Sequence, residues 1–162
     1  MKKTLYILLA MMLLLVGCGK SSVIKDEKCI TGKMESINEN TIEIDEFEFL
    51  LLDDENDEKR IDELGIDISD NPNWYEIYNE SEETIELIVD ENTVFTFYDV
   101  GNLFVEETED KLYTTKNFEE FKEFAEIKVP SELHPNATVI GTLFEFVLDG
   151  DRIVSMTEIW VN

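Results

Sequence analysis

An Asp149-Gly150 pair lies between two strand-like runs, residues 139–148 and 151–161, and restricts the fold more than any other local feature. Asp-Gly favours a type I′ turn, because both central residues of that turn need a positive φ. The pair therefore predicts a β-hairpin, and with it antiparallel pairing, at the C-terminal end of the chain.

Similar runs recur upstream. They are rich in β-branched and aromatic residues and are bounded by turn residues. The predicted strands cover residues 30–37, 41–52, 74–79, 84–90, 93–100 and 111–114, with turns at 38–40 and 70–73. In the second run, Ile42 and Ile44 alternate, but Phe47, Phe49 and Leu51 follow on the opposite parity. That switch indicates a bulge or a strand buried on both faces.

Two helices are predicted between these strands. Residues 58–64 form a short helix that Gly65 would end. A clearer helix begins at Asn117, a capping residue with Glu120 three positions on, and carries Phe118, Phe121, Phe124 and Ala125 at helical spacing. The order ββ-α-βββ-α-ββ predicts an α+β fold, mostly antiparallel: a curved sheet or partly open barrel, with an OB-like barrel as one candidate.

The charge of the chain is strongly one-sided. Residues 29–162 hold 8 basic and 36 acidic side chains, a net charge of −28. Such a body repels nucleic acid and anionic lipid headgroups, and attracts divalent cations only weakly and diffusely. Ten Phe and two Trp in the chain still allow a packed core. We therefore expect a single acidic globular domain over 29–162.

The N-terminal segment has the pattern of an export signal. Lys2-Lys3 precede an uncharged run, residues 4–19, that is shorter than the roughly 20 apolar residues of a membrane-spanning helix. Leu15-Val16-Gly17-Cys18 resembles the lipobox of bacterial lipoproteins. The alternative is an uncleaved N-terminal helix.

The resemblance to bacterial lipoproteins implies how the chain is processed. Residues 1–17 would be a signal peptide, and Cys18 would carry diacylglycerol, with residues 18–28 as a basic tether. The implied location is the outer face of the bacterial cytoplasmic membrane or the cell envelope. The body is more loosely similar to small lipoproteins of Gram-positive bacteria, which implies no activity.

Lipidation of Cys18 leaves Cys29 without an intramolecular partner. A lone cysteine near the start of a strand is most often a small buried hydrophobe. A reactive thiol needs electropositive neighbours, and this body is acidic. We therefore expect Cys29 to be buried and unreactive.

Catalytic patterns are missing from the sequence. His134 is the one histidine and lies in a predicted loop, with no Ser or Cys motif nearby. Neither a Gly-x-Ser-x-Gly elbow nor a Gly-rich phosphate loop occurs. With 38 acidic residues, carboxylate pairs arise everywhere by chance. No catalytic residue and no cofactor are predicted, and the protein is expected not to be an enzyme.

The acidic run Asp53–Glu58 is the candidate for a Ca²⁺ site, because hard oxygen ligands suit that ion. As an EF-hand loop starting at Asp53, it has Glu58 where Gly is needed and Leu64 where the bidentate Glu is needed. A solvated loop that leads into a helix is therefore favoured over a metal site.

One strand face is a candidate binding surface. If Tyr75 and Ile77 face the core, then Trp74, Glu76 and Tyr78 point outward together and could bind a sugar, a peptide or a cationic partner. The alternative is that these side chains pack beneath a helix or form cross-strand pairs.

These features favour a membrane-anchored extracytoplasmic module that binds a protein or an envelope component without catalysis. One alternative is an acidic inhibitor or immunity factor against a cationic envelope protein, which the strong negative field would steer to it. Another is an envelope enzyme that depends on Ca²⁺.

Overall fold

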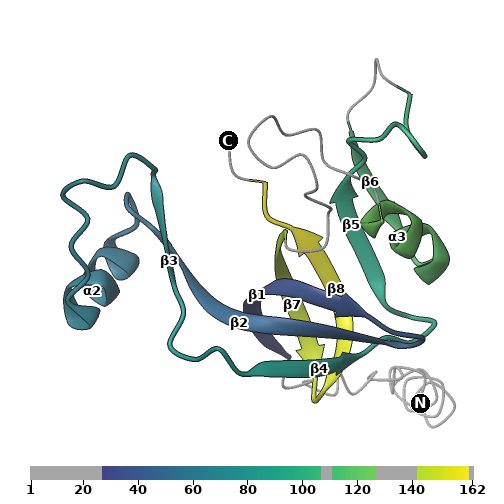
Figure 1. Ribbon diagram of the computed structural model, residues 1–162, viewed down its shortest axis with the longest axis horizontal. Coiled ribbons are helices and arrows are strands. Elements are labelled where there is room, and N and C mark those ends of the chain that lie inside the picture. The colour runs from purple at the N-terminus through teal and green to yellow at the C-terminus, as the bar shows by residue number, and fades with distance from the viewer. Residues whose placement is uncertain (1–26, 107–110, 127–141, 161–162) are drawn as a thin grey trace, which may run out of the picture.

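The computed structural model describes residues 27–106, 111–126 and 142–160. Figure 1 shows a curved sheet with α3 at one side and an arm that carries α2 at the other. The described elements are β1 (Lys28–Ile37), β2 (Thr41–Leu51), α2 (Glu55–Leu64), β3 (Tyr75–Tyr78), β4 (Thr84–Ile88), β5 (Val94–Tyr98), β6 (Leu112–Thr115), α3 (Phe118–Ala125), β7 (Leu143–Asp149) and β8 (Arg152–Glu158). The predicted α+β class is confirmed.

The sheet has the order β3-β2-β1-β7-β8-β5-β6, and β4 also pairs with β2 and β8. Strands β1, β2, β4, β8 and β7 therefore form a ring of pairings. The join between β4 and β8 is a single parallel pair, Ile88 with Arg152. The ring thus closes the curved sheet into a partly open barrel, and the OB-like candidate stays a prediction.

Aromatic packing between α3 and β5 forms one wall of the core. Phe121 stacks on Phe95 with ring centroids 4.7 Å apart, and Phe124 stacks on Phe97 at 3.9 Å. The predicted apolar face of this helix is confirmed, since Phe121, Phe124 and Ala125 are fully buried. The same cluster includes inward residues of the barrel strands, among them Met34, Ile42, Ile44, Phe144, Phe146, Ile153 and Met156.

The N-terminal cap of α3 contains the Asn117 half of a capping box but not the bond from the Glu120 side chain back to the Asn117 N–H. Asn117 Oδ1 accepts from the Glu119 backbone N–H at 3.1 Å, as a capping residue should. The Glu120 carboxylate, however, accepts from the hydroxyls of Thr115 and Tyr113, at 2.7 and 3.1 Å. Glu120 therefore fastens α3 to β6.

Strand β2 has buried residues both inside and outside the main core cluster. Ile42 and Ile44 belong to the barrel core, whereas Phe47 and Leu50 are buried but lie outside that cluster. The change of parity in the sequence, from Ile42 and Ile44 to Phe47, coincides with the point where β2 leaves the barrel core. The irregularity in the β1–β2 pairing lies on β1, between Met34 and Ser36, and not on β2. Of the two alternatives, burial on both faces of β2 therefore fits the structure, because Ile44 and Phe47 are both buried and lie on opposite parities.

The C-terminal hairpin is confirmed, but its turn is one residue further along than predicted. Asp149 pairs with Arg152, so the two-residue loop is Gly150 and Asp151. Gly150 has φ +70°, while Asp151 is not among the residues with positive φ. A positive φ at the first position alone is the pattern of a type II′ turn, which glycine favours there.

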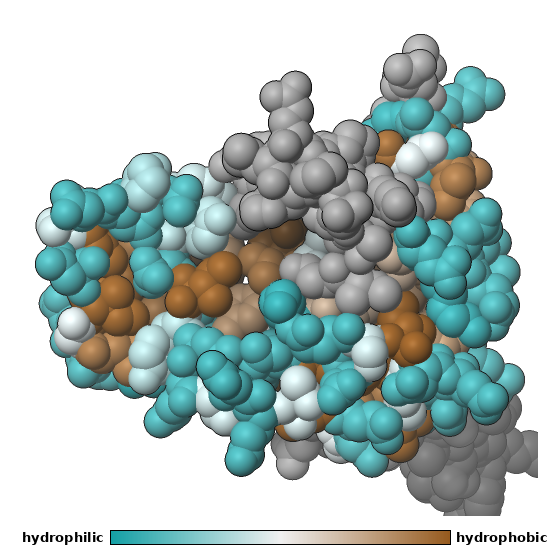
Figure 2. Space-filling view, viewed as in Figure 1, coloured by the Kyte–Doolittle hydropathy of each residue, from teal (hydrophilic) through white to brown (hydrophobic). Residues whose placement is uncertain are grey.

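The N-terminal boundary of the folded part also moves by one residue. Lys28, predicted to end the tether, is the first residue of β1 and pairs with Leu148 of β7. Beyond the barrel, β2 and β3 extend into the arm, and the surface between arm and barrel is hollowed, with hydrophobic atoms at its floor (Figure 2).

Candidate binding groove

A groove forms where the strand paired with one edge of β2 changes from β4 to β3. Residues 41–45 of β2 pair with β4, and residues 48–51 pair with β3. The chain between β3 and β4 passes outside residues 46–48 and encloses a cavity of about 320 Å³. Its lining consists of Glu46, Phe47 and Glu48 from β2, Tyr78 from β3, Glu80, Ser81 and Glu83 from the connection, and Ile85 from β4.

The connection that forms the outer wall is held by its own hydrogen bonds. Asn79 Nδ2 donates to both carboxylate oxygens of Asp45, at 3.0 and 2.9 Å. The Ser81 N–H donates to Asn79 Oδ1 at 3.0 Å, and the Glu83 N–H donates to Ser81 Oγ at 3.1 Å. The carboxylates of Glu80 and Glu83 have no part in these bonds, so they can interact with a ligand without loosening the wall.

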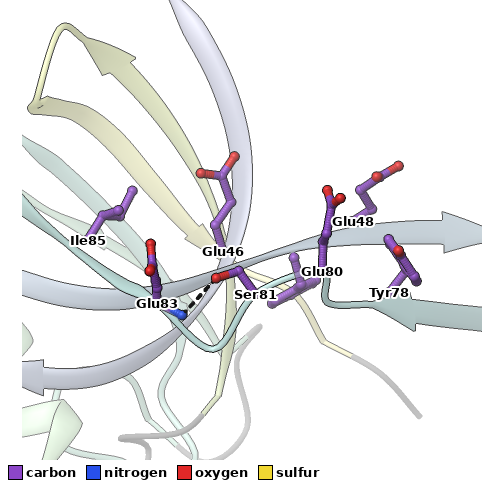
Figure 3. A pocket seen from close by; sticks show the side chains of 8 residues that line it. Glu46, Glu48, Tyr78, Glu80, Ser81, Glu83 and Ile85 are labelled. Carbon is purple, nitrogen blue, oxygen red and sulfur yellow. Dashed lines mark hydrogen bonds between the residues drawn. The ribbon is translucent and has the colours of Figure 1, made fainter.

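Four carboxylates surround the groove and point toward the same side of β2 (Figure 3). Lys28 Nζ lies 3.2 Å from Glu46 Oε1, and Arg60 donates two hydrogen bonds to Glu48. These bonds with Arg60 hold the pKa of Glu48 below its ordinary value. Within the described part of the chain, Glu80 and Glu83 form no ion pair, so two negative charges at the groove are uncompensated.

Apolar and aromatic side chains also line the groove. Phe47 is 7% exposed, Tyr78 is half-buried and Ile85 is 36% exposed. Lysine and arginine side chains lay their methylene stems along such surfaces while the charged end stays near water and acidic groups. The arrangement therefore suits an amphipathic cation better than a small, fully hydrated one.

A second cavity, of about 310 Å³, adjoins the groove on the other side of β2. It opens because β1 and β2 separate: Thr31 pairs with Phe47, but residues 28–30 pair with β7. Glu46, Phe47 and Glu48 line both cavities. The two cavities therefore form adjoining hollows across the point where β2 leaves the barrel.

The candidate binding residues Trp74, Glu76 and Tyr78 have different surroundings in the structure. Ile77, expected to face the core, is 37% exposed. Glu76 accepts a hydrogen bond from Asn71 Nδ2 at 2.7 Å, while Tyr78 lines the groove. The premise about Ile77 is corrected, and ligand binding by the three residues stays a prediction.

Trp74 belongs instead to an aromatic cluster of the arm. Phe49 stacks on Tyr75 with ring centroids 5.0 Å apart, and Trp74 meets both rings edge-on at 6.4 and 5.5 Å. Cross-strand packing therefore accounts for part of the Trp74–Tyr78 segment, as the alternative interpretation expected. Trp74 still remains 49% exposed.

Cys29 is exposed, so the expectation of a buried cysteine is wrong. It lies on β1 at the second cavity, where the strand has left β2. Partial burial of the sulfur, together with the negative charge and hydrogen bond of Glu145, raises the pKa of the thiol. A raised pKa disfavours the thiolate, the nucleophilic form.

Most of the acidic run Asp53–Glu58 is helix rather than loop. Helix α2 begins at Glu55, three residues earlier than predicted, because Asp54 caps it by accepting from the N–H groups of Asn56 and Asp57 at 2.8 and 3.2 Å. Asp57 Oδ2 accepts from the Leu51 N–H at 2.9 Å. Two carboxylates of the run thus bond to the backbone, which supports a structural role over the less favoured alternative of a Ca²⁺ site. The end of α2 at Gly65 is confirmed, with φ +67°.

Cys18 and His134 lie outside the described residues. Among the residues that are described, no helix is long and apolar enough to cross a membrane. Sequence reasoning missed the groove, although Asn79–Glu83 is an acidic run between two strands. In a chain with 38 acidic residues such a run does not stand out, and only the fold places it beside Phe47 and Ile85.

Comparisons with protein-family models, with curated proteins and with solved structures found no match.

Proposed function

We propose that this chain is a lipid-anchored binding module of a bacterial cell envelope. It is attached through Cys18 to the outer face of the membrane, is not an enzyme, and binds a cationic protein or a cationic cell-wall component. The observation that carries the binding part is the groove beside residues 46–48, where Glu80 and Glu83 are uncompensated and apolar and aromatic side chains share the lining.

The anchor rests on the residues around Cys18. Two acyl chains hold a protein stably on a bilayer, because each buried methylene contributes about 0.8 kcal/mol. The tether holds Lys20, Lys25 and Lys28, which favour the membrane surface, whereas the acidic body is repelled by anionic headgroups. The body would therefore stand off the bilayer with its ligand-binding surface accessible.

An acidic inhibitor or immunity factor is the second candidate. The net charge of −28 over residues 29–162 would speed encounter with a basic partner and make that encounter strongly dependent on salt. A binding module and an inhibitor differ in their effect on the partner. An inhibitor would abolish the activity of a basic envelope enzyme in proportion to its own concentration, whereas an accessory module would leave that activity in place.

Two measurements test the proposal. Bacteria that express the full chain are fed an alkyne-tagged fatty acid, and label on the wild type that is missing from a Cys18→Ala variant supports the anchor. The full chain is then incubated with purified basic envelope proteins at low and physiological salt. Salt-sensitive capture supports a cationic partner. Capture of acidic and basic proteins alike, or of neither, contradicts it.

A further inference from the structure

We infer that the groove beside residues 46–48 binds a lysine- or arginine-rich extended segment of another protein close to the membrane surface, and that Glu80 and Glu83 recognise it. This inference rests on the proposed function and assigns a partner class and two recognition residues to it.

The chemistry of the lining selects the kind of cation. The carboxylates of Glu80 and Glu83 are uncompensated within the described chain, and Phe47, Tyr78 and Ile85 add apolar and aromatic surface to the lining of the same groove. Lysine and arginine are the protein side chains that combine a long apolar stem with a fixed positive charge. Aromatic rings add a favourable interaction with cations that approach their faces.

The form of the groove favours an extended segment rather than a single side chain. The groove of about 320 Å³ and the adjoining cavity of about 310 Å³ share Glu46, Phe47 and Glu48 as a common boundary. A segment that crosses β2 would therefore place successive side chains in the two hollows. Charged positions along such a segment would meet Glu80 and Glu83 on one side of β2.

The tether places this site near the bilayer. Lys28 is the first residue of β1, and its ammonium group lies 3.2 Å from Glu46 at the groove. Ten residue steps separate Cys18 from Lys28, which span at most about 33 Å when fully extended. The groove therefore remains within a few nanometres of the membrane. Anionic headgroups concentrate basic segments at that same surface.

The test compares two pairs of isosteric substitutions in the full chain, reconstituted in vesicles of zwitterionic phosphatidylcholine. Glu80→Gln with Glu83→Gln removes the two uncompensated charges of the groove. Glu39→Gln with Glu91→Gln is the matched control. It removes two exposed charges at the end of the β2–β4 pair that lies away from the groove. The probe is a fluorescein-labelled deca-lysine peptide, titrated at fixed ionic strength and followed by fluorescence anisotropy.

We expect the groove pair to weaken deca-lysine binding about tenfold and the control pair by less than about twofold, because a contacting charge contributes more than a distant screened one. Equal losses in both pairs would overturn the assignment of the groove while leaving a cationic partner in place. Failure of the wild type to bind the peptide at any salt concentration would overturn the proposed function itself. Thermal melting of all variants checks that each is folded.

A second titration with spermine tests the partner class. Spermine carries several positive charges but has no peptide backbone and cannot span both cavities with side chains. Binding of spermine that is at least tenfold weaker than that of deca-lysine supports a polypeptide ligand. Equal affinity, lost equally in the groove pair, would overturn that assignment in favour of a small polyamine.

Discussion

Arg60 of α2 donates two hydrogen bonds to the carboxylate of Glu48 on β2, from Nε to Oε2 at 2.8 Å and from Nη2 to Oε1 at 2.6 Å. The bidentate geometry fastens the helix to the strand that continues into the barrel. It also neutralises one of the four carboxylates around the groove. The side chains are 39% and 40% exposed, so the contact stabilises the arm less than a buried pair would.

Replacing Arg60 by Gln should make the groove a better cation site. The substitution frees the Glu48 carboxylate, so deca-lysine should bind more tightly, while the melting temperature falls by no more than a few degrees. Lys59→Gln, on the same helix and with the same charge change, is the control. An equal gain in affinity in the control would mean that net charge alone sets binding.

Asp99 organises the turn after β5 and should be the most damaging carboxylate to replace. Its side chain is fully buried and accepts from the N–H groups of Leu103, Phe104 and Val105 at 2.9, 2.7 and 2.8 Å. Asp99→Asn should cost roughly 1.5–3 kcal/mol of unfolding free energy, because an amide cannot accept all three bonds. Urea denaturation measures this loss, and the exposed Asp67→Asn variant should lose less.

The same site should be sensitive to acid. Burial by itself would raise the pKa of Asp99, but the three N–H groups and Lys111 outweigh it and hold the pKa below the ordinary value. The stabilisation is therefore complete above the unfolded pKa of about 3.9 and is lost as the pH falls through the lower folded value. The stability difference between wild type and Asp99→Asn should persist at pH 5 and shrink below about pH 4. A difference that vanishes already at pH 6 would contradict this account.

Glu158 should have the opposite pH dependence. Its carboxyl is 8% exposed, and burial raises its pKa although Oε2 accepts from the Tyr98 N–H at 2.8 Å. The folded chain therefore retains the proton more strongly than the unfolded chain, and stability is lost as the pH rises through the folded pKa. Glu158→Gln keeps an acceptor for Tyr98, so it should melt a few degrees higher than wild type at pH 7.

At pH 4 the gain from Glu158→Gln should disappear, since both chains then carry a neutral group. Differential scanning calorimetry at the two pH values measures the effect. Glu158→Ala, which removes the acceptor and leaves the Tyr98 N–H unpaired, should melt lower at both. If Glu158→Gln melted below wild type at pH 7, the carboxylate's bond to Tyr98 would outweigh its desolvation.

Cys29 should react slowly with alkylating reagents despite its exposure. Burial of the sulfur and then Glu145 raise the pKa of the thiol. Glu145→Gln removes the charge, so iodoacetamide should modify Cys29 a few times faster at pH 8, as followed by mass spectrometry of its peptide. Glu39→Gln, in the β1–β2 turn, should leave the rate unchanged. Equal rates for both variants would show that burial alone protects the thiol.

Sequence patterns predicted most elements because those patterns are local. The spacing of Phe118, Phe121 and Phe124 predicted α3, and Gly65 predicted the end of α2. The predicted start of α2 was wrong, because an aspartate such as Asp54 occurs both in loops and as a helix cap. Only its hydrogen bonds with the N–H groups of Asn56 and Asp57 identify it as the cap.

Nonlocal arrangement was not predictable in the same way. Alternation in the Trp74–Tyr78 segment says which side chains share a face, but not which face is covered. Ile77 is exposed because β3 lies at the edge of the sheet, in the arm, rather than over the barrel core. The groove likewise combines residues from β2, the end of β3 and the start of β4, and no short window of sequence contains it.

The passage of β2 from the barrel to the arm has a consequence for hydrogen exchange. Ile42 and Ile44 lie between β1 and β4, whereas Leu50 is paired with β3 alone. Contiguous units of a protein open with separate free energies. Amides of one unbroken strand should thus divide into two classes: those near Ile44 exchange only through global unfolding, and those near Leu50 exchange whenever the arm alone opens.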